Sequence, residues 1–310
     1  MTVSIGVFLL VTAWLLTDPA TSRGDALKTG GLAGGAIVAL YALWINDRRR
    51  RTEEARHEVE RGRVQHDLDR VDNERFAKAV ELLGHEADQV RVGALHALAG
   101  LARNRPSHTQ TVLDVLCSYL RRPFTHPSYE TRPGDPDQAE VEPSEKWPAE
   151  RITVADRERQ VRLAAQRLIA DLLPETSAAQ PVLYDLDFTA ANLEYLDLTK
   201  RQVGMLTARR TRLHGHSRLG YLRVHGRALF SSAVFHGETD FYQARFDGGL
   251  SMFMARVDGL WRVPEATVRD FVDLRTKAPE RQKGTLTVVD GAEIKLGEDT
   301  GWQLVTQNHS

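Results

Sequence analysis

Three histidines recur in the chain at a spacing that could bring metal ligands together. His214, His225 and His236 are eleven residues apart, and each follows an apolar residue and precedes a Gly. Asp247 and Asp258 continue the same series. Imidazole and carboxylate groups bind zinc, which takes four protein ligands in a closed site and three in a catalytic one. Whether these side chains converge depends on the repeat that carries them.

The histidines belong to a repeat with a fine period of five to six residues. The repeated phrase is apolar residue, His or Asp, then Gly, as in Leu213-His214-Gly215. Around it, apolar residues recur from Phe188 to Val257 at steps of five, and later at alternating steps of six and five. A second inward position, mostly apolar, precedes each by two residues, and such residues share a strand face but not a helix face. A Gly every eleven residues would also cost a helical supercoil about 1 kcal/mol each. The pattern therefore predicts a stacked β-solenoid.

The segment Ala191-Asn192-Leu193-Glu194-Tyr195 resembles the repeating unit of the pentapeptide-repeat proteins. The resemblance covers residues 183–259 and implies a right-handed, four-sided β-helix in which each pentapeptide forms one side. The later units carry a sixth residue in every second side, which predicts coils of 22 rather than 20 residues. We expect the extra residue to bulge at a corner beside the recurrent Gly, which tolerates unusual backbone angles.

A coil of 22 residues divides the histidines between two sides. His214 and His236 should stack about 4.8 Å apart on one side, and His225 should stack with Asp247 on another. No three ligands converge, so we expect no metal and interpret the histidines as solvated corner residues. No phosphate-binding loop, nucleophile elbow or paired carboxylates are present, which predicts a non-enzymatic protein without a cofactor. Cys117, the single cysteine, is expected to be a packed core thiol in a reducing compartment.

Residues 1–46 contain two apolar stretches, Val3–Leu16 and Gly30–Ile45. With their flanking residues they approach the roughly 20 residues that a membrane-spanning helix needs, so we expect a hairpin of two transmembrane helices. A cleaved signal peptide is the alternative, but its positively charged start is missing. Gly30, Gly31, Gly34 and Gly35 form two small-xxx-small spacings, which would pack the hairpin or join two copies as a homo-oligomer.

Four consecutive arginines, Arg48–Arg51, follow the second stretch. Under the positive-inside rule they place the inner face of the plasma membrane here, with both termini and the folded domains cytoplasmic. Residues 47–72 are highly charged with both signs interspersed, which predicts a charged juxtamembrane stalk helix.

Residues 73–178 are expected to form a small helical domain. Helices are predicted from Asn73, from Ala87 to Arg103, after Pro106, and over 154–173. The second resembles one helix of a HEAT-type pair. The insert 123–152 contains six prolines and many acidic residues, and its composition predicts a flexible loop or a docking segment. In combination, these segments resemble a group of actinobacterial membrane-anchored pentapeptide-repeat proteins.

The tail, residues 260–310, loses the eleven-residue period. It is expected to cap the open end of the solenoid, with a hairpin around Asp290-Gly291, or to fold back on one side. The chain as a whole is thus predicted to be of the α+β class.

These features predict a membrane-anchored scaffold for protein–protein interaction. Nucleic-acid mimicry directed at a topoisomerase is an alternative, but residues 183–258 contain ten basic and eight acidic residues, a net charge of +2, where a mimic should be acidic. We expect no nucleic-acid partner. A cluster of basic residues predicts a patch for an acidic protein or anionic lipid. Its members are Lys200, Arg201, Arg209, Arg210, Arg212, Arg218 and Arg223.

Overall fold

The computed structural model describes residues 69–298 and 301–307, together with residues 6, 9–10, 13–14, 35–36, 39 and 41–47. Two compact units are formed, Met1–Asp72 and Asn73–Ser310. Within the described residues, no helix is both long enough and apolar enough to cross a membrane. Most of the two apolar stretches, and residues 48–68, lie outside this set. The transmembrane hairpin and the stalk helix therefore stay predictions.

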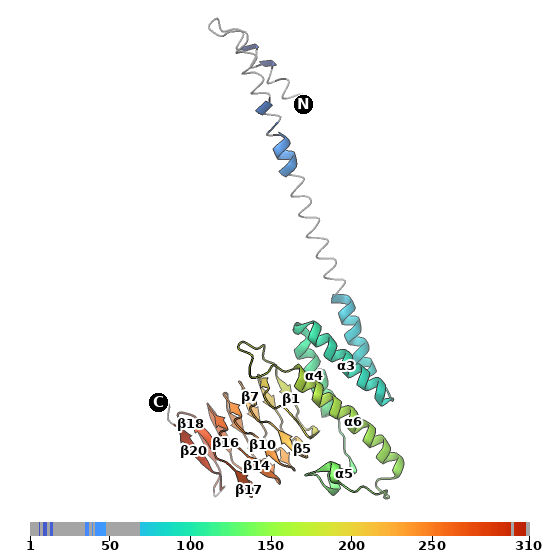
Figure 1. Cartoon of the computed structure of the whole chain (residues 1–310), viewed down its shortest axis with the longest axis vertical. Helices are drawn as coiled ribbons and strands as arrows, with labels where there is room; N and C mark the ends of the chain where they lie inside the picture. Colours follow the sequence, from blue (N-terminus) through green and yellow to red (C-terminus); the bar gives the residue numbers. More distant parts are fainter. Residues whose placement is uncertain are drawn as a thin grey trace. The chain divides into compact units, whose positions relative to one another are not determined.

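The second unit begins with helices. Residues 69–82 are helical and lead to a turn at Gly84, where the predicted helix end lies. The predicted start at Asn73 is wrong, because the residues before Asn73 are already helical. The helices that follow are α3 (Asp88–Asn104), η1 (Pro106–His108), α4 (Thr109–Arg121) and α6 (Ala149–Leu172). Helices α3, α4 and α6 pack on one another, with an apolar stripe of α4 fully buried between them (Figure 1). A helical domain is therefore confirmed, and α6 begins five residues before its predicted start.

The insert 123–152 is folded, so the prediction of a flexible loop is wrong. It contains α5 (Pro127–Thr131) and η2 (Pro136–Gln138), each with a proline in its first turn, where the missing N–H needs no partner. Pro127, Pro136 and Trp147 are buried. Composition alone missed these contacts because the insert packs against the solenoid instead of forming a core of its own.

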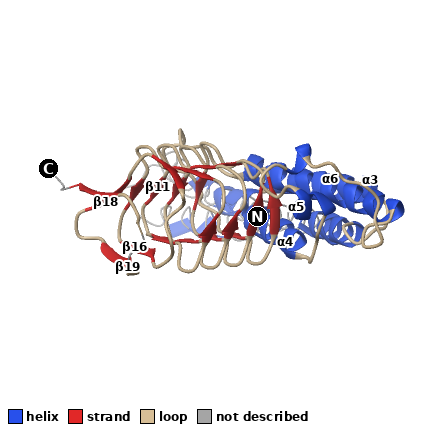
Figure 2. Ribbon diagram, turned by 90° about the horizontal axis from the view of Figure 1, so that it is seen from below, coloured by secondary structure: helices blue, strands red, loops and turns tan. Residues whose placement is uncertain are grey.

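The rest of the unit is a parallel β-solenoid of about five turns with four sides. The β1 side contains β1 (Leu186–Asp187), β4 (Leu206–Thr207), β8 (Ala228–Leu229), β12 (Leu250–Ser251), β16 (Phe271–Leu274) and β19 (Glu293–Leu296). The β2 side contains β2 (Asn192–Glu194), β5 (Arg212–His214), β9 (Val234–Phe235) and β13 (Arg256–Val257). The β6 side contains β6 (Ser217–Arg218), β10 (Thr239–Asp240), β14 (Leu260–Arg262) and β17 (Arg281–Lys283). The β3 side contains β3 (Gln202–Val203), β7 (Arg223–Val224), β11 (Arg245–Phe246), β15 (Thr267–Val268), β18 (Leu286–Val289) and β20 (Leu304–Gln307). Figure 2 shows these strands stacked into a rod with the helices gathered at one end.

The register confirms the predicted coil lengths. Leu186 pairs with Leu206, twenty residues on, whereas Leu206 pairs with Ala228 and Ala228 with Leu250, steps of 22. The sixth residue enters after the β2 side and after the β3 side, where the recurrent glycines lie. The inward positions are buried as predicted, apart from Val257, which is half-buried, and Arg201, whose side chain is 22% exposed.

One coil contributes a phenylalanine from each of its four sides to the core. Phe230, Phe235, Phe241 and Phe246 are at most 2% exposed. Trp261 from the next coil lies against two of them, with ring centroids 4.8 Å from Phe241 and 5.3 Å from Phe235. Such edge and tilted contacts add to the large apolar area that aromatic rings bury.

The recurrent glycines are needed for close stacking of successive coils. A Cβ on Gly226 would lie 2.9 Å from the Gly204 carbonyl oxygen, and one on Gly237 would overlap the Gly215 carbonyl. Positive φ is not the general reason, because Gly226 and Gly237 do not adopt it. It occurs instead at the five-residue corners, at non-Gly residues such as Tyr221 and Met254. The expected corner bulge is present, and the glycine mainly permits proximity there; among the recurrent glycines 215, 226, 237, 248 and 259, Gly215 alone has a positive φ.

The coils continue beyond residue 259, so the expected tail is part of the solenoid. Trp261 pairs with Gln282 and Val272 with Ile294, all in parallel. The predicted hairpin around Asp290-Gly291 is wrong, because β18 and β19 lie on different sides of the coil and do not pair with each other. The sequence did not reveal these later coils for two reasons. The coil length shortens again, to 20 residues between Val268 and Val288, and the repeated phrase disappears.

Candidate functional site: a charged groove beside the first coil

The helices dock on the first coil of the solenoid through side chains that cover its free strand edges. On the β1 side, the Gln110 amide of α4 exchanges two hydrogen bonds with the backbone of Asp185, at 2.8 and 3.0 Å. On the β2 side, the Gln166 side chain of α6 accepts a hydrogen bond from the Glu194 N–H at 3.2 Å. Backbone amides at an edge need such partners when water is excluded.

A buried ion pair joins α6 to the same coil. Glu194 is 2% exposed, and its carboxylate accepts two hydrogen bonds from Arg159 Nε, at 2.8 and 3.0 Å, and a third contact from the other end of the guanidinium. The Tyr129 hydroxyl donates to Glu194 at 2.8 Å. Burial, and next the Glu194 charge, raises the pKa of Tyr129 above its ordinary range. The pKa of Arg159 is raised, mainly by its side-chain hydrogen bonds to Glu194, so the guanidinium keeps its charge.

The insert 123–152 contacts the β2 side through a stack of three rings. Tyr129 lies on His214 with ring centroids 3.9 Å apart, and His214 lies on His236 at 4.9 Å. The predicted stacking of the two histidines is therefore confirmed. His214 is only 3% exposed, however, so the expectation of a solvated corner residue is wrong for it. Its burial, together with the nearby His236 and Arg212, lowers the pKa of His214 to about 3, and the ring stays neutral.

The second predicted pair lies on the β3 side, as expected. His225 and Asp247 follow β7 and β11, neighbouring strands of that side. His225 Nε2 lies 2.8 Å from the Gln202 side-chain oxygen, and Asp247 accepts a hydrogen bond from Arg223 at 2.8 Å. Beside the first pair, His236 Nδ1 lies 3.0 Å from the Asp258 carboxylate. In the described part of the chain, no group of three His, Cys, Asp or Glu residues is placed to hold a metal ion.

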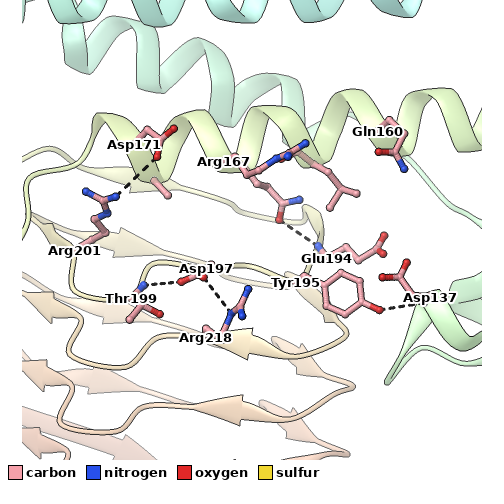
Figure 3. Close-up of a pocket in the computed structure, with 13 residues that line it drawn as sticks. Asp137, Gln160, Arg167, Asp171, Glu194, Tyr195, Asp197, Thr199, Arg201 and Arg218 are labelled. Atoms are coloured by element: carbon pink, nitrogen blue, oxygen red, sulfur yellow. Dashed lines mark hydrogen bonds and ion pairs between the residues drawn. The ribbon is translucent and has the colours of Figure 1, made fainter.

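A groove of about 710 Å³ lies between α6 and the first two coils (Figure 3). Helix α6 runs along its upper wall, and segments of the β2 and β6 sides form its floor. Its lining residues are Asp137, Gln160, Leu163, Gln166, Arg167, Ala170, Asp171, Glu194, Tyr195, Asp197, Thr199, Arg201 and Arg218. Two of these are aliphatic and most are polar or charged, unlike the mainly apolar lining of small-molecule pockets. The groove is therefore suited to recognition by hydrogen bonds and ion pairs.

The charges along the groove are paired with one exception. Arg218 Nε lies 3.1 Å from Asp197, and Arg201 lies 3.9 Å from Asp171. The two remaining carboxylates, Asp137 and Glu194, are held by Arg159. Arg167 has no ion pair within the described ranges, and its Nε–H donates only to the Leu163 carbonyl of its own helix at 3.4 Å. One uncommitted positive charge thus faces the groove.

Cys117 is buried in α4, as predicted. Burial is the main cause that raises the pKa of the thiol to about 12. The thiolate that would act as a nucleophile or ligand is therefore scarce at neutral pH.

The seven basic residues of the predicted patch are spread around the coils. They occupy β5 (Arg212), β6 (Arg218), β7 (Arg223), the corner before β3 (Lys200, Arg201) and the corner before β5 (Arg209, Arg210). Each five-residue step turns the chain to a new side, so residues clustered within 24 positions of the sequence do not share a face. Arg201 and Arg218 line the groove, and Arg223 pairs with Asp247.

Sequence reasoning missed Glu194, Arg159 and Arg167. A signal was present in α6, where Arg159, Arg162 and Gln166 lie at helical spacing and face the core and the first coil, since Arg162 and Gln166 are buried. Glu194 occupies a variable position of the repeat unit, and nothing in that pattern indicates burial.

No protein-family model matches this chain, and neither a curated protein nor a solved structure is similar enough to count as a match. The parallel, four-sided solenoid is compatible with a pentapeptide-repeat fold.

Proposed function

We propose that this protein is a non-enzymatic, membrane-anchored scaffold that presents its solenoid and helical domain to a protein partner in the cytoplasm. The observation that carries the proposal is the fused architecture of the second unit. The helices cover the first coil through buried contacts such as Arg159–Glu194, and the insert covers part of the β2 side of the next two coils. Outward side chains of the later coils, such as Arg245 and Arg256, are exposed. A rigid rod with open, polar sides is typical of repeat proteins that bind other proteins.

The outward-facing charged side chains of successive coils favour a protein partner over nucleic-acid mimicry. On the β6 side, Arg218 pairs with Asp197 and Arg262 with Glu238 at 3.3 Å, so successive coils alternate in charge. A nucleic-acid mimic would need a continuous row of negative charge. Binding to anionic lipid remains the second candidate, supported by Arg209, Arg210 and Arg212, which are exposed and have no ion pairs in the described ranges.

Membrane anchoring in this proposal rests on Val3–Leu16, Gly30–Ile45 and the arginines that follow them. The same proposal includes three further points. The chain would belong to the pentapeptide-repeat family, α3 and α4 would form a HEAT-like pair, and copies of the chain would associate through Gly30 and Gly34.

Fractionation and cross-linking of the full chain test the proposal. The chain should stay in the membrane fraction after carbonate extraction, and photo-reactive residues placed on one side of the later coils should cross-link one protein. A protein that is released by carbonate, or that forms no specific cross-link from any of the four sides, would contradict it.

A further inference from the structure

The first coil presents four free strand edges toward the helical domain, and three of them have hydrogen-bond partners. On the β1 side the partner is the Gln110 side chain, and on the β2 side it is the Gln166 side chain. On the β3 side, the Gln202 N–H donates to the Pro174 carbonyl at 2.8 Å. The helical domain and its link to the solenoid therefore cover these edges as a neighbouring coil would.

In the part of the chain that the structure describes, no segment covers the fourth edge, on the β6 side. Leu198 and Arg218 join the first coil to the second, through Leu198 N–H to Arg218 O and Arg218 N–H to Leu196 O. Asp197 points its own N–H and C=O the other way, and neither group has a hydrogen-bond partner among the described residues. Asp197 lies on the floor of the groove (Figure 3). An unpaired edge of this kind is a template for another strand.

The groove has the length of a short strand. Its α6 wall extends from Gln160 to Asp171, about 16 Å at the helical rise of roughly 1.5 Å per residue. An extended segment of about five residues spans a similar distance at roughly 3.3 Å per residue. The polar lining provides partners for its side chains.

The uncommitted charge indicates which segment would fit. The other charged side chains of the groove already have opposite partners, and Arg167 on the α6 wall has none in the described ranges. A carboxylate on the bound segment would complete the pairing with a charge-assisted hydrogen bond.

We propose that the groove captures an extended polypeptide segment with an acidic side chain, which adds as a strand to the Asp197 edge and pairs with Arg167. This inference rests on the proposed scaffold function and names its binding site. Main-chain hydrogen bonds to Asp197 hold the segment, and the wall residues select its side chains, as in other proteins that bind peptides by strand addition.

The test uses the full chain in detergent and a displayed library of random octapeptides. Selected peptides should share one Asp or Glu, and Arg167→Glu should weaken their binding about tenfold or more. Arg157→Glu, which reverses an exposed charge of α6 outside the groove, is the matched control and should leave binding unchanged. Ala170→Trp should obstruct the groove and abolish binding. Each variant is compared with the parent by its thermal transition.

N-methylation of the best peptide tests strand addition directly. Methyl groups on alternate backbone nitrogens should abolish binding, and those between them should be tolerated, because only every second amide faces the edge. Failure to select any peptide, selection of peptides that bind R167E as tightly as the parent, or the absence of the alternation would overturn the inference. A partner that cross-links to the outer sides but not to Thr199 would leave the scaffold proposal standing while the groove assignment fails.

Discussion

Tyr129 lies face to face with His214, with ring centroids 3.9 Å apart and ring planes 8° from parallel. One ring comes from the proline-rich insert and the other from the second coil of the solenoid. The contact explains how a segment without the composition of a core becomes ordered, because its Tyr129 ring packs against a ring from another part of the chain. It also makes the stability of the junction dependent on a neutral histidine.

We predict that the unfolding free energy falls as the pH is lowered from about 6.5 toward 3. The unfolded chain binds a proton on His214 near the ordinary pKa of 6.5, whereas burial lowers the folded pKa to about 3. The folded state therefore binds fewer protons across this window, and its stability contribution is complete above pH 6.5. Denaturant titrations at several pH values measure the loss, which is on the order of a few kcal/mol.

His214→Gln provides the comparison, because an amide does not titrate. The difference in unfolding free energy between the parent and H214Q should change with pH in this window. A difference that stays constant from pH 7 to pH 3.5 would contradict the buried, neutral ring.

The ion pair between Arg159 and Glu194 should be strongly coupled. Removing either partner leaves a buried charge, and such changes typically cost about 3–5 kcal/mol. A double-mutant cycle with Arg159→Ala and Glu194→Ala measures the coupling by denaturant unfolding. The exposed pair Lys277–Glu280, with side chains 82% and 86% exposed, is the matched control and should show no measurable coupling. Equal results for both cycles would refute the proposed role of the buried pair.

Phe241→Ala should destabilise the solenoid by about 3–5 kcal/mol, because it opens a cavity where Trp261 and Phe246 pack. Met254→Ala removes a side chain of the same solenoid that is 64% exposed, and its effect should lie within about 0.5 kcal/mol. Both free energies of unfolding are measured in urea. A large loss for F241A alone indicates a tightly packed aromatic core, whereas similar small losses for both variants would indicate a loosely filled interior.

Two glycine substitutions should change stability in opposite directions. A Cβ at position 237 would overlap the backbone of the preceding coil, so Gly237→Ala should lower the melting temperature strongly. Gly93 lies inside α3 with no atom within 4 Å of an added Cβ, and alanine there should stabilise by about 0.5–1 kcal/mol. Stabilisation by G237A would show that the coils are not in close contact at this corner.

The sequence predicted the repeated part of the fold well and the junction poorly. The steps of five and six residues predicted which positions face inward and that His214 and His236 stack, because every side obeys the same local rule. Glu194, Arg167 and the insert are not part of the repeat. Their positions depend on contacts between segments that are distant in the chain, and a repeat period does not predict such contacts. The coils after residue 259 were missed because their steps change length.

The charged groove illustrates the same difference. Asp197 and Arg218 could be placed on successive coils from the period alone. The period could not predict that the Asp197 edge lacks a partner. Whether that edge is covered depends on where α6 lies and on which of its side chains reach the first coil.

Site-specific photo-cross-linking of the full chain in its native membrane tests the scaffold account most directly. Photo-reactive residues at Asp240, Leu229, Arg245 and Val234 sample the four sides, and one at Thr199 samples the groove. The account predicts that one protein is cross-linked from a single side and that the other three sides give no cross-link. A cross-link from Thr199 in the groove is compatible with this result but is not required. Equal labelling from all four sides, or none from any position, would contradict it.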